Sequence, residues 1–547
     1  MRAGDVDQLM MLPPSVREWL PEDHLAFFVL DVVAELDLSA FYLVYRVDGR
    51  GGSVYDPAMM LAVLLYAYCT GERSSRRIER RLVEDVAMRV VAANQQPDHA
   101  TLARFRRRHQ GAIAALFGQV LGLCVKAGLV DGGVVAIDGT KIAANASFFA
   151  NREQADLSAE LAESVQRDPA AAARRLADQV LAEAEQVDTA EDEQGENDQV
   201  RRMPAGWAGG RDRRSRIRAA LDELESQKSR DFEARMAERA RKEAELGRKL
   251  TGPKPSAQTA RRARPRRANT TDPHSRIIAQ ASKGVLQGYN AQAAATAGHI
   301  VVAAEVTNTT NDQPHFVPMA NAVTENLAEA GHRGGAGAFV ADAGYWTSAN
   351  GTTDVGAEVL IATRKSSWRK ADKPDDDKLA VLARVNRGEL SQRQAGALLG
   401  VSYTWVRDMT KRYFGRDGQR ITRSAEPEPQ EWIPIVERVA AGESSLRAAS
   451  DELNVSVSRV KTMLAHIRGD IIDPTIARNM MDTKLSQPEN AAIYRKRSVS
   501  IEPVFGNIKA NMGFRKFSLR GHAGVQSEWR LICTVHNLLK LQNAAAA

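Results

Sequence analysis

The sequence predicts a multidomain protein of the α+β class, and three observations lead to that prediction. The first quarter of the 547-residue chain has helical patterns, short apolar strands follow at two separate places, and a helical repeat lies in the second half. This length corresponds to roughly three or four domains at about 100–200 residues each. The longest nearly apolar stretch, residues 58–69, is shorter than the ~20 residues that cross a bilayer, so a membrane protein is not expected.

Residues 1–130 are expected to form a helical domain that binds DNA or mediates dimerisation. An apolar run is followed by a Gly-containing turn and an amphipathic basic segment, and Asp98 or Thr101 can cap a further helix. Residues 73–108 contain ten arginines but four acids. Ion pairing at the surface is the commoner role of such arginines, but the shortage of acids favours contact with the DNA backbone. The last helix holds four candidates: Arg104, Arg106, Arg107 and Arg108.

Short apolar or alternating strands characterise residues 131–147 and 284–363. The segments are GGVVAID, VLQGYNAQAA, HIVVAAEV, GAFVAD and EVLIAT, with the amphipathic helix HFVPMANAVTENLAEAG between the third and the fourth. Their order predicts a mixed sheet flanked by helices. The chain then ends in further helical patterns, and the expected sheet domain comprises residues 131–147, 271–364 and 484–546.

Residues 148–270 are expected to form a charged helical insert that ends in a basic linker. Residues 151–200 hold four arginines and 14 acids (net −10), whereas residues 201–270 hold 21 Lys and Arg against nine acids (net +12). Acids and bases recur three or four residues apart, which is typical of solvent-exposed helices or a coiled-coil hairpin. The net charge of +7 for the whole chain is therefore a cancellation. Residues 261–267 form a strongly basic segment interrupted by proline, and their composition indicates that they contact phosphates.

A repeat within residues 371–470 predicts two helix-turn-helix units. Residues 381–406 match residues 435–460, and the shared pattern has a small residue, Leu, a Gly or Asn turn, and then Val-Ser. Gly400 and Asn454 suit the tight turn, while Ser402 and Ser456 can cap the second helix. Those second helices would present Arg407 and Arg459, among others. Contact with DNA is favoured over a plain packing role, and dimerisation is an equal alternative.

Three acids stand out by their positions as candidate metal ligands. Asp138 ends the apolar strand GGVVAID, Asp342 ends GAFVAD, and Glu502 begins a helix on which Lys509 lies two turns further on. An acid at the end of a buried strand is costly unless it is paired or bound to a metal, so two such ends in one sheet indicate a shared cation. A third carboxylate would complete a site for two Mg²⁺ ions, which activate water and stabilise the leaving oxygen of a phosphodiester.

At these motifs the chain resembles the bacterial insertion-sequence transposases of the DDE class, which have a ribonuclease-H-like catalytic fold. The matching segments are PDHATLARFRRRH, VVAIDGTKIAANAS, TDPHSR with GYNAQAA, VADAGYW, and YRKRSVSIEPVFGNIKANMGFRKFSLRG. Only the repeat falls outside the resemblance. The resemblance implies that Asp138, Asp342 and Glu502 are catalytic and bind the metal ions, two Mg²⁺ with Mn²⁺ as an alternative.

The resemblance also suggests how DNA is held. The Tyr-Arg-Glu-Lys signature of the family falls on Tyr494, Arg497, Glu502 and Lys509, with one residue more than usual between Arg497 and Glu502. Arg497 and Lys509 would hold phosphates of the transposon end, and Tyr494 would orient the scissile strand. Trp346 could stack on a flipped base, although a place in the core is equally expected. Glu305, Asp312 and Glu528 rank below the three candidate acids.

The implied function is a cytoplasmic, nucleoid-associated transposase. It would bind the terminal inverted repeats of its element as a homodimer, hydrolyse one strand at each end, and join the freed 3′-OH to double-stranded target DNA. A non-catalytic DNA-binding regulator built on the same scaffold is the alternative, and a general nuclease is a weaker one. The three cysteines, Cys69, Cys124 and Cys533, have no CxxC spacing and predict neither disulfides nor a zinc site.

Overall fold

The computed structural model describes residues 16–45, 54–159, 210–245, 249, 254, 267–280, 284–363, 376–413, 427, 429–470 and 472–545. The chain divides into two compact units. One comprises Met1–Ala341, Thr353–Leu360 and Ala491–Ala547, and the other Asp342–Thr352 and Ile361–Asn490. Helices and a mixed sheet together confirm the predicted α+β class. Among the described residues, none of the helices has the length and apolar character needed to cross a membrane.

The first unit begins with helices, as the sequence predicts. They are α1 (Leu25–Glu35), α2 (Ser39–Tyr42), α3 (Pro57–Cys69), α4 (Ser75–Glu84), α5 (Val86–Val91), α6 (His99–Arg108) and α7 (Gln110–Lys126), after a 3₁₀ turn at Val16–Trp19. Of the two caps considered for α6, the structure has Asp98, which accepts from the Thr101 N–H at 2.6 Å. The bonds from Thr101 hold the pKa of the Asp98 carboxyl below its ordinary value.

The mixed sheet lies in the same unit and is built around its longest strands. Its strands are β1 (Val134–Ala143), β4 (Arg276–Gln280), β5 (Gly284–Thr296), β6 (Val301–Thr307), β7 (Ala338–Ala341) and β8 (Glu358–Ile361), in the order β4-β5-β1-β7-β8 with β6 paired to β5. Strand β1 is antiparallel to β5 and parallel to β7. β4 and β6 share the other edge of β5. All five expected strands are present, and β4 is an addition that the sequence did not suggest.

One expectation about β1 was wrong. Asp138 was expected to end this strand, but the strand runs on to Ala143 because residues beyond Asp138 pair with β5, from Gly139 with Gln292 to Ala143 with Gly288. Pairing with β7, in contrast, stops at Ile137 and Ala341. Asp138 therefore lies at the end of the parallel pairing, yet in the middle of a strand held by its antiparallel neighbour.

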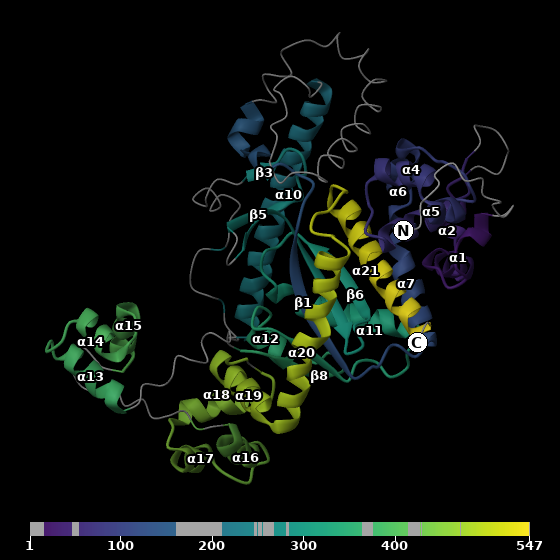
Figure 1. Ribbon diagram of the computed structural model, residues 1–547. Coiled ribbons are helices and arrows are strands. Elements are labelled where there is room, and N and C mark those ends of the chain that lie inside the picture. The colour runs from purple at the N-terminus through teal and green to yellow at the C-terminus, as the bar shows by residue number, and fades with distance from the viewer. Residues whose placement is uncertain are drawn as a thin grey trace, which may run out of the picture. The chain divides into compact units, whose positions relative to one another are not determined.

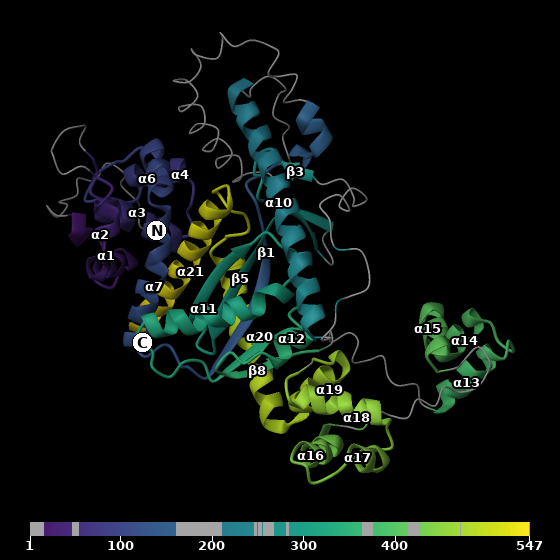
Figure 2. The same ribbon diagram turned by 180° about the vertical axis from the view of Figure 1, so that it is seen from behind.

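Helices cover the sheet in both views (Figures 1 and 2). Helix α11 (Phe316–Glu329) packs on β6, and the yellow C-terminal helix α21 (His522–Ala545) lies along α7 and also contacts β6. The core here is apolar, with Trp529 fully buried, and its indole N–H donates to the Gln292 carbonyl at 2.9 Å. α21 is thus fixed directly to the strand that pairs with β1.

The charged insert is described in part. Helix α10 (Gly210–Glu245) confirms a long charged helix, and its apolar residues Ile217, Ala220 and Leu224 form a small core with Leu157 and Ala268. A short two-stranded sheet, β2 (Asn151–Glu153) with β3 (Arg267–Asn269), was not predicted. Residues 160–209 and 255–266, which include the acidic stretch and most of the basic linker, lie outside the described residues.

The repeat in the second unit forms two groups of three helices, each with its own core. One group has α13 (Asp376–Asn386), α14 (Gln392–Leu399) and α15 (Tyr403–Tyr413), and the other has α16 (Pro429–Ala440), α17 (Leu446–Leu453) and α18 (Val457–Ile467). Gly400 and Asn454 take positive φ angles of 64° and 51°. Ser402 and Ser456 each accept from a backbone N–H three residues on, at 3.2 Å. The expected turn and cap residues are confirmed.

The last helices complete the fold and correct a second expectation. α12 (Ser348–Thr352) and α19 (Pro474–Ser486) belong to the second unit, and α20 (Pro488–Gly506) leads back into the first. Glu502 was expected to begin a helix on which Lys509 lies two turns further on. Instead, α20 starts at Pro488, and Pro503 lies inside it. Lys509 lies in a π-helical turn, Asn507–Asn511, that follows α20. Glu502 and Lys509 therefore do not share one regular α-helix.

Candidate active site

Asp138 is the sheet's contribution to the candidate site. Its side chain is 22% exposed. The backbone N–H of Gly139 donates to Asp138 Oδ1 at 2.7 Å, and Arg497 Nη1 donates to Oδ2 at 3.1 Å. Because side chains alternate along a strand, Asp138 and Thr140 share one face of β1 while Lys141 lies on the other. The contact with Arg497 shows that α20 covers the face of Asp138.

Glu502 and Arg497 come from α20, a little more than one turn apart. Arg497 Nη2 lies 3.4 Å from Glu502 Oε1, so a single guanidinium contacts both carboxylates. The Glu502 side chain is 60% exposed, whereas that of Arg497 is 19% exposed. The structure thus brings together three of the predicted site residues, Asp138, Arg497 and Glu502. The two carboxylates face each other across one positive charge.

Lys509 ties the turn after α20 to β1. Its ammonium donates to the Thr140 hydroxyl and, at 3.0 Å, to the Lys141 carbonyl. Thr140 lies two residues from Asp138 on the same face of the strand. Lys509 was expected to hold a phosphate, and here its donors are directed at the strand next to Asp138. This contact links the helix that bears Glu502 to the strand that bears Asp138.

Oxygen ligands of this kind suit hard divalent cations such as Mg²⁺. Among the described residues, no group of three or more His, Cys, Asp or Glu side chains is arranged to hold an ion. The Arg497 guanidinium lies between the two carboxylates that would be needed. An ion could contact both the Asp138 and the Glu502 carboxylates only if the Arg497 guanidinium moved aside.

Asp342 directly follows β7, as predicted, and is the first residue of the chain that belongs to the second compact unit. Its carboxylate accepts from the Gly344 N–H at 2.8 Å, and its carbonyl from the Tyr345 N–H at 3.2 Å, so it closes its own turn. The last paired positions of β1 and β7 are Ile137 and Ala341. The next residue along each strand is an aspartate, Asp138 in one and Asp342 in the other.

Trp346 does not fit a base-stacking role in this conformation. Its side chain is 8% exposed. Its ring lies close to Gly351, where a Cβ would lie 2.8 Å from the Cη2 atom. An aromatic ring must present a face to stack on a base. The core position, which the sequence favoured equally, is the one the structure has.

The N-terminal arginines divide into two kinds. Arg104, Arg107 and Arg108 are exposed on α6. Arg106 was expected to contact DNA, but it is 2% exposed and donates to the Tyr68 and Ser75 hydroxyls and to the Arg73 carbonyl. It lies one helical turn after Leu102, on the face that enters the core. Its guanidinium is occupied inside the domain.

Arginines of the second unit and Tyr494 complete the predicted set. Arg407 is exposed on α15. Arg459 is partly buried and donates to Asp473 Oδ2 at 3.0 Å, which ties α18 to the start of α19. Tyr494 is partly buried on α20, one turn before Arg497.

Positive charge gathers in the first unit where β1 ends. Arg73 Nη1 donates to the Lys516 carbonyl at 3.1 Å, and Arg520 Nε to the Asn145 carbonyl at 2.9 Å. Burial, followed by the charges of Arg73 and Arg520, lowers the pKa of Lys516 below its ordinary value.

The lower-ranked acids all have structural partners. Glu305 pairs with Arg530, and Asp312 accepts from Lys141, Asn290 and Gln292 on the opposite face of β1 from Asp138. Glu528 is 1% exposed and accepts from Ser518 and Leu519. Sequence patterns did not reveal the contacts of Glu305 and Asp312, because these join residues far apart in the sequence. The contacts of Glu528 join residues about ten positions apart.

Two family models match the chain. A model of a transposase domain (DUF772) matches residues 14–108, and a model of a transposase DDE domain matches residues 467–542, which include Arg497, Glu502 and Lys509. Asp138 and Asp342 lie outside both matches. No curated protein and no solved structure matches the chain.

Proposed function

Because these two matches indicate an insertion-sequence DDE transposase, we propose that the chain binds the ends of its element, cleaves a strand at each end, and joins the 3′-OH to target DNA. The observation that carries this proposal is the contact of one guanidinium, Arg497, with both Asp138 and Glu502. These acids come from a strand and a helix that are far apart in sequence. The mixed sheet and its flanking helices are consistent with a ribonuclease-H-like catalytic domain.

Asp342 is proposed as the third catalytic carboxylate. The register of β1 and β7 supports this role, because the residues after Ile137 and Ala341 are Asp138 and Asp342. DDE transposases typically use divalent metals. Asp138, Asp342 and Glu502 would hold two Mg²⁺ ions here, or Mn²⁺. Such ions lower the pKa of a bound water and stabilise the leaving oxygen of a phosphodiester.

Arg497 has two roles in this proposal. Without metal, it neutralises Asp138 and Glu502, which would otherwise repel each other. With the carboxylates occupied, its guanidinium is released toward the DNA backbone, where its planar donors match phosphate oxygens. Tyr494 lies one turn away on the same helix and would orient the strand. Lys509 keeps the end of α20 against β1.

DNA binding is assigned to several exposed basic groups. Arg104, Arg107 and Arg108 on α6 would contact the backbone of the element end, and Arg407 would do so from α15. Each phosphate that is neutralised releases counterions, so end binding should weaken steeply with salt. Homodimerisation on the paired ends remains part of the proposal. Deleting residues 371–470 tests the repeat, since unchanged affinity and footprint would rule out its contact with DNA.

The experiment that tests the function uses the full chain with a plasmid that carries the borders of the encoding element. We expect end-specific nicks and strand-transfer products that require a divalent metal. Binding of the ends without cleavage by the wild type would instead identify a non-catalytic regulator. Cleavage without preference for the ends would identify a general nuclease.

A further inference from the structure

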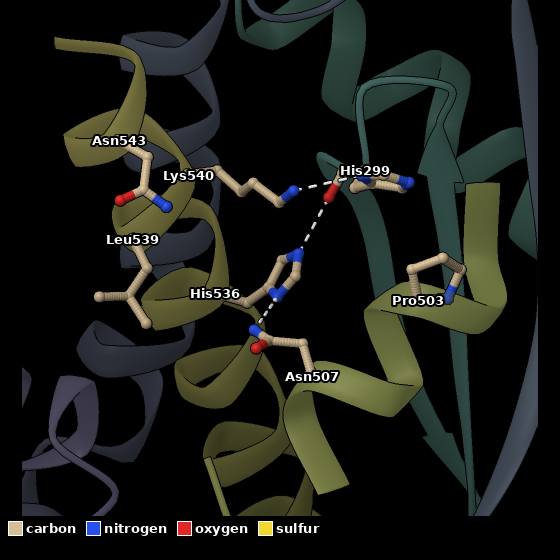
Figure 3. Close-up of a pocket in the computed structure, with 7 residues that line it drawn as sticks. All are labelled: His299, Pro503, Asn507, His536, Leu539, Lys540 and Asn543. Carbon is tan, nitrogen blue, oxygen red and sulfur yellow. Dashed lines mark hydrogen bonds between the residues drawn. The ribbon is translucent and has the colours of Figure 1, made fainter. Parts of the chain in front are cut away.

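A pocket of about 300 Å³ lies behind α20, between this helix and α21 (Figure 3). It is lined by His299, Pro503, Asn507, His536, Leu539, Lys540 and Asn543. Four of these residues form a continuous chain of hydrogen bonds. Asn507 Nδ2 donates to His536 Nδ1 at 3.1 Å, His536 Nε2 donates to the His299 carbonyl at 2.9 Å, and Lys540 Nζ donates to His299 Nδ1 at 3.2 Å.

The partners determine the tautomer of both imidazoles. A backbone carbonyl only accepts, so Nε2 of each histidine carries the proton, and each Nδ1 accepts from an amide or an ammonium. His536 is 1% exposed, and burial lowers its pKa to about 4. The chain of bonds is complete with both rings neutral.

One further hydrogen bond links His299 to α20, at the position where Pro503 interrupts the hydrogen bonding of this helix. Proline has no N–H, so the carbonyl four residues earlier, that of Val499, loses its helical partner. His299 Nε2 donates to this carbonyl at 2.8 Å. Pro503 directly follows Glu502, and Val499 lies between Arg497 and Glu502. The Val499 carbonyl, which lacks a partner within the helix, therefore lies between the site residues Arg497 and Glu502.

His299 is itself held in an unusual backbone conformation. It lies in the tight turn between β5 and β6 with a φ of 66°, a backbone conformation that residues other than Gly rarely adopt. The turn is closed by a bond from the Thr296 N–H to the Ile300 carbonyl at 3.0 Å. The strands beside the turn belong to the sheet that contains Asp138. His299 thus connects the sheet to α20 at its proline.

We propose that His299 is a positioning residue for the transposase site: it supplies the donor that Pro503 lacks at the Val499 carbonyl. It thereby fixes the segment of α20 that carries Arg497 and Glu502 relative to Asp138. Only the expected effect of His299 on catalysis rests on the proposed function. The positioning itself is a property of the helix. Neither histidine contacts the reacting atoms.

The test compares His299→Leu with His299→Gln in the full chain. Both substitutions meet the same positive φ, but the glutamine amide can donate from a position close to that of Nε2. We expect His299→Leu to speed amide hydrogen exchange in residues 497–506 and to slow metal-dependent cleavage, each about tenfold, the factor for loss of one ordinary hydrogen bond. His299→Gln should recover most of both. Asn543→Ala, which changes the pocket wall outside the chain of bonds, should behave as wild type.

Pro503→Ala provides a second test that does not depend on the stability of one variant. Alanine restores an N–H for the Val499 carbonyl, so His299→Leu should have little further effect on exchange in this background. Equal effects of His299→Leu with Pro503 and with Ala at this position would overturn the proposal, as would equal behaviour of the Leu and Gln variants. If the wild type cleaves no DNA, the proposed function fails, while the exchange comparison still decides the role of His299.

Discussion

Replacing Glu528 tests the distinction between a structural acid and a catalytic one. Glu528 and Glu502 lie in the same family match, yet their surroundings differ completely. Both Glu528 oxygens accept from the Ser518 N–H, at 3.0 and 2.9 Å, and Oε2 accepts from the Leu519 N–H at 2.9 Å. The Ser518 hydroxyl donates to Oε1 as well. The carboxylate thus holds the loop that leads into α21.

The structure sets the size of the effect. Glu528→Ala leaves three donors without a partner, and Ser518 is 5% exposed, so water replaces the carboxylate poorly. At about 1–3 kcal/mol for each of these three donors, the free energy of unfolding should fall by about 3–9 kcal/mol. Glu528→Gln keeps one acceptor oxygen and should lose about half of that. In contrast, Glu305 and Arg530 are 39% and 35% exposed, so Glu305→Ala should cost less than about 1 kcal/mol.

The assay is chemical unfolding of the full chain, followed by cleavage measured at a temperature where each variant is folded. Glu502→Gln should show the reverse of Glu528→Ala, with normal stability and no cleavage. A Glu528→Ala protein of wild-type stability that has lost cleavage would refute this reasoning. Glu528 would then be a better candidate than Glu502 for the catalytic glutamate.

Two further predictions follow from burial and from close contacts. The pKa of His536 falls from 6.5 unfolded to about 4 folded, so the unfolded chain binds more protons as the pH drops between these values. The wild type should therefore lose up to about 3 kcal/mol of stability from pH 6.5 to 4, and His536→Gln should lose less, by denaturant titration; equal slopes contradict this. At Gly139, an added Cβ would overlap Gln292 Nε2 and lie 2.9 Å from Asp312 Oδ1. Gly139→Ala should cost about 1–3 kcal/mol, whereas Gly118→Ala on α7, with nothing within 4 Å, should stabilise by about 0.5–1 kcal/mol; similar melting temperatures for the two variants would contradict the packing argument.

Local patterns predicted much of the fold because they report local physics. Alternating or apolar runs located five strands of the sheet, and the repeat predicted the positive φ of Gly400 and Asn454. The full length of β1 was not predictable, because its polar continuation from Gly139 is a strand only through pairing with β5. The short strands β2, β3 and β4 likewise depend on distant partners.

The sequence singled out the acids of the candidate site, but it did not reveal most of the contacts that support them. Asp138 and Glu502 stood out by their motifs, and the structure has them on either side of Arg497. Arg106 was misjudged because a run of arginines conceals which member faces inward, although Leu102 one turn earlier marks that face. The contact of His299 with the Val499 carbonyl was invisible, since it joins a turn of the sheet to the interior of α20.

The measurement that tests the central claim most directly is strand cleavage by Asp138→Asn, with binding of the same DNA end measured on the same samples. Asparagine keeps the shape of the side chain and removes the charge that a divalent ion requires. We predict that Mg²⁺-dependent cleavage is lost while end binding stays within about threefold of the wild type, a change of less than one ordinary hydrogen bond. Cleavage at the wild-type rate would contradict the assignment of Asp138 to catalysis, and loss of binding together with cleavage would show that its role is structural.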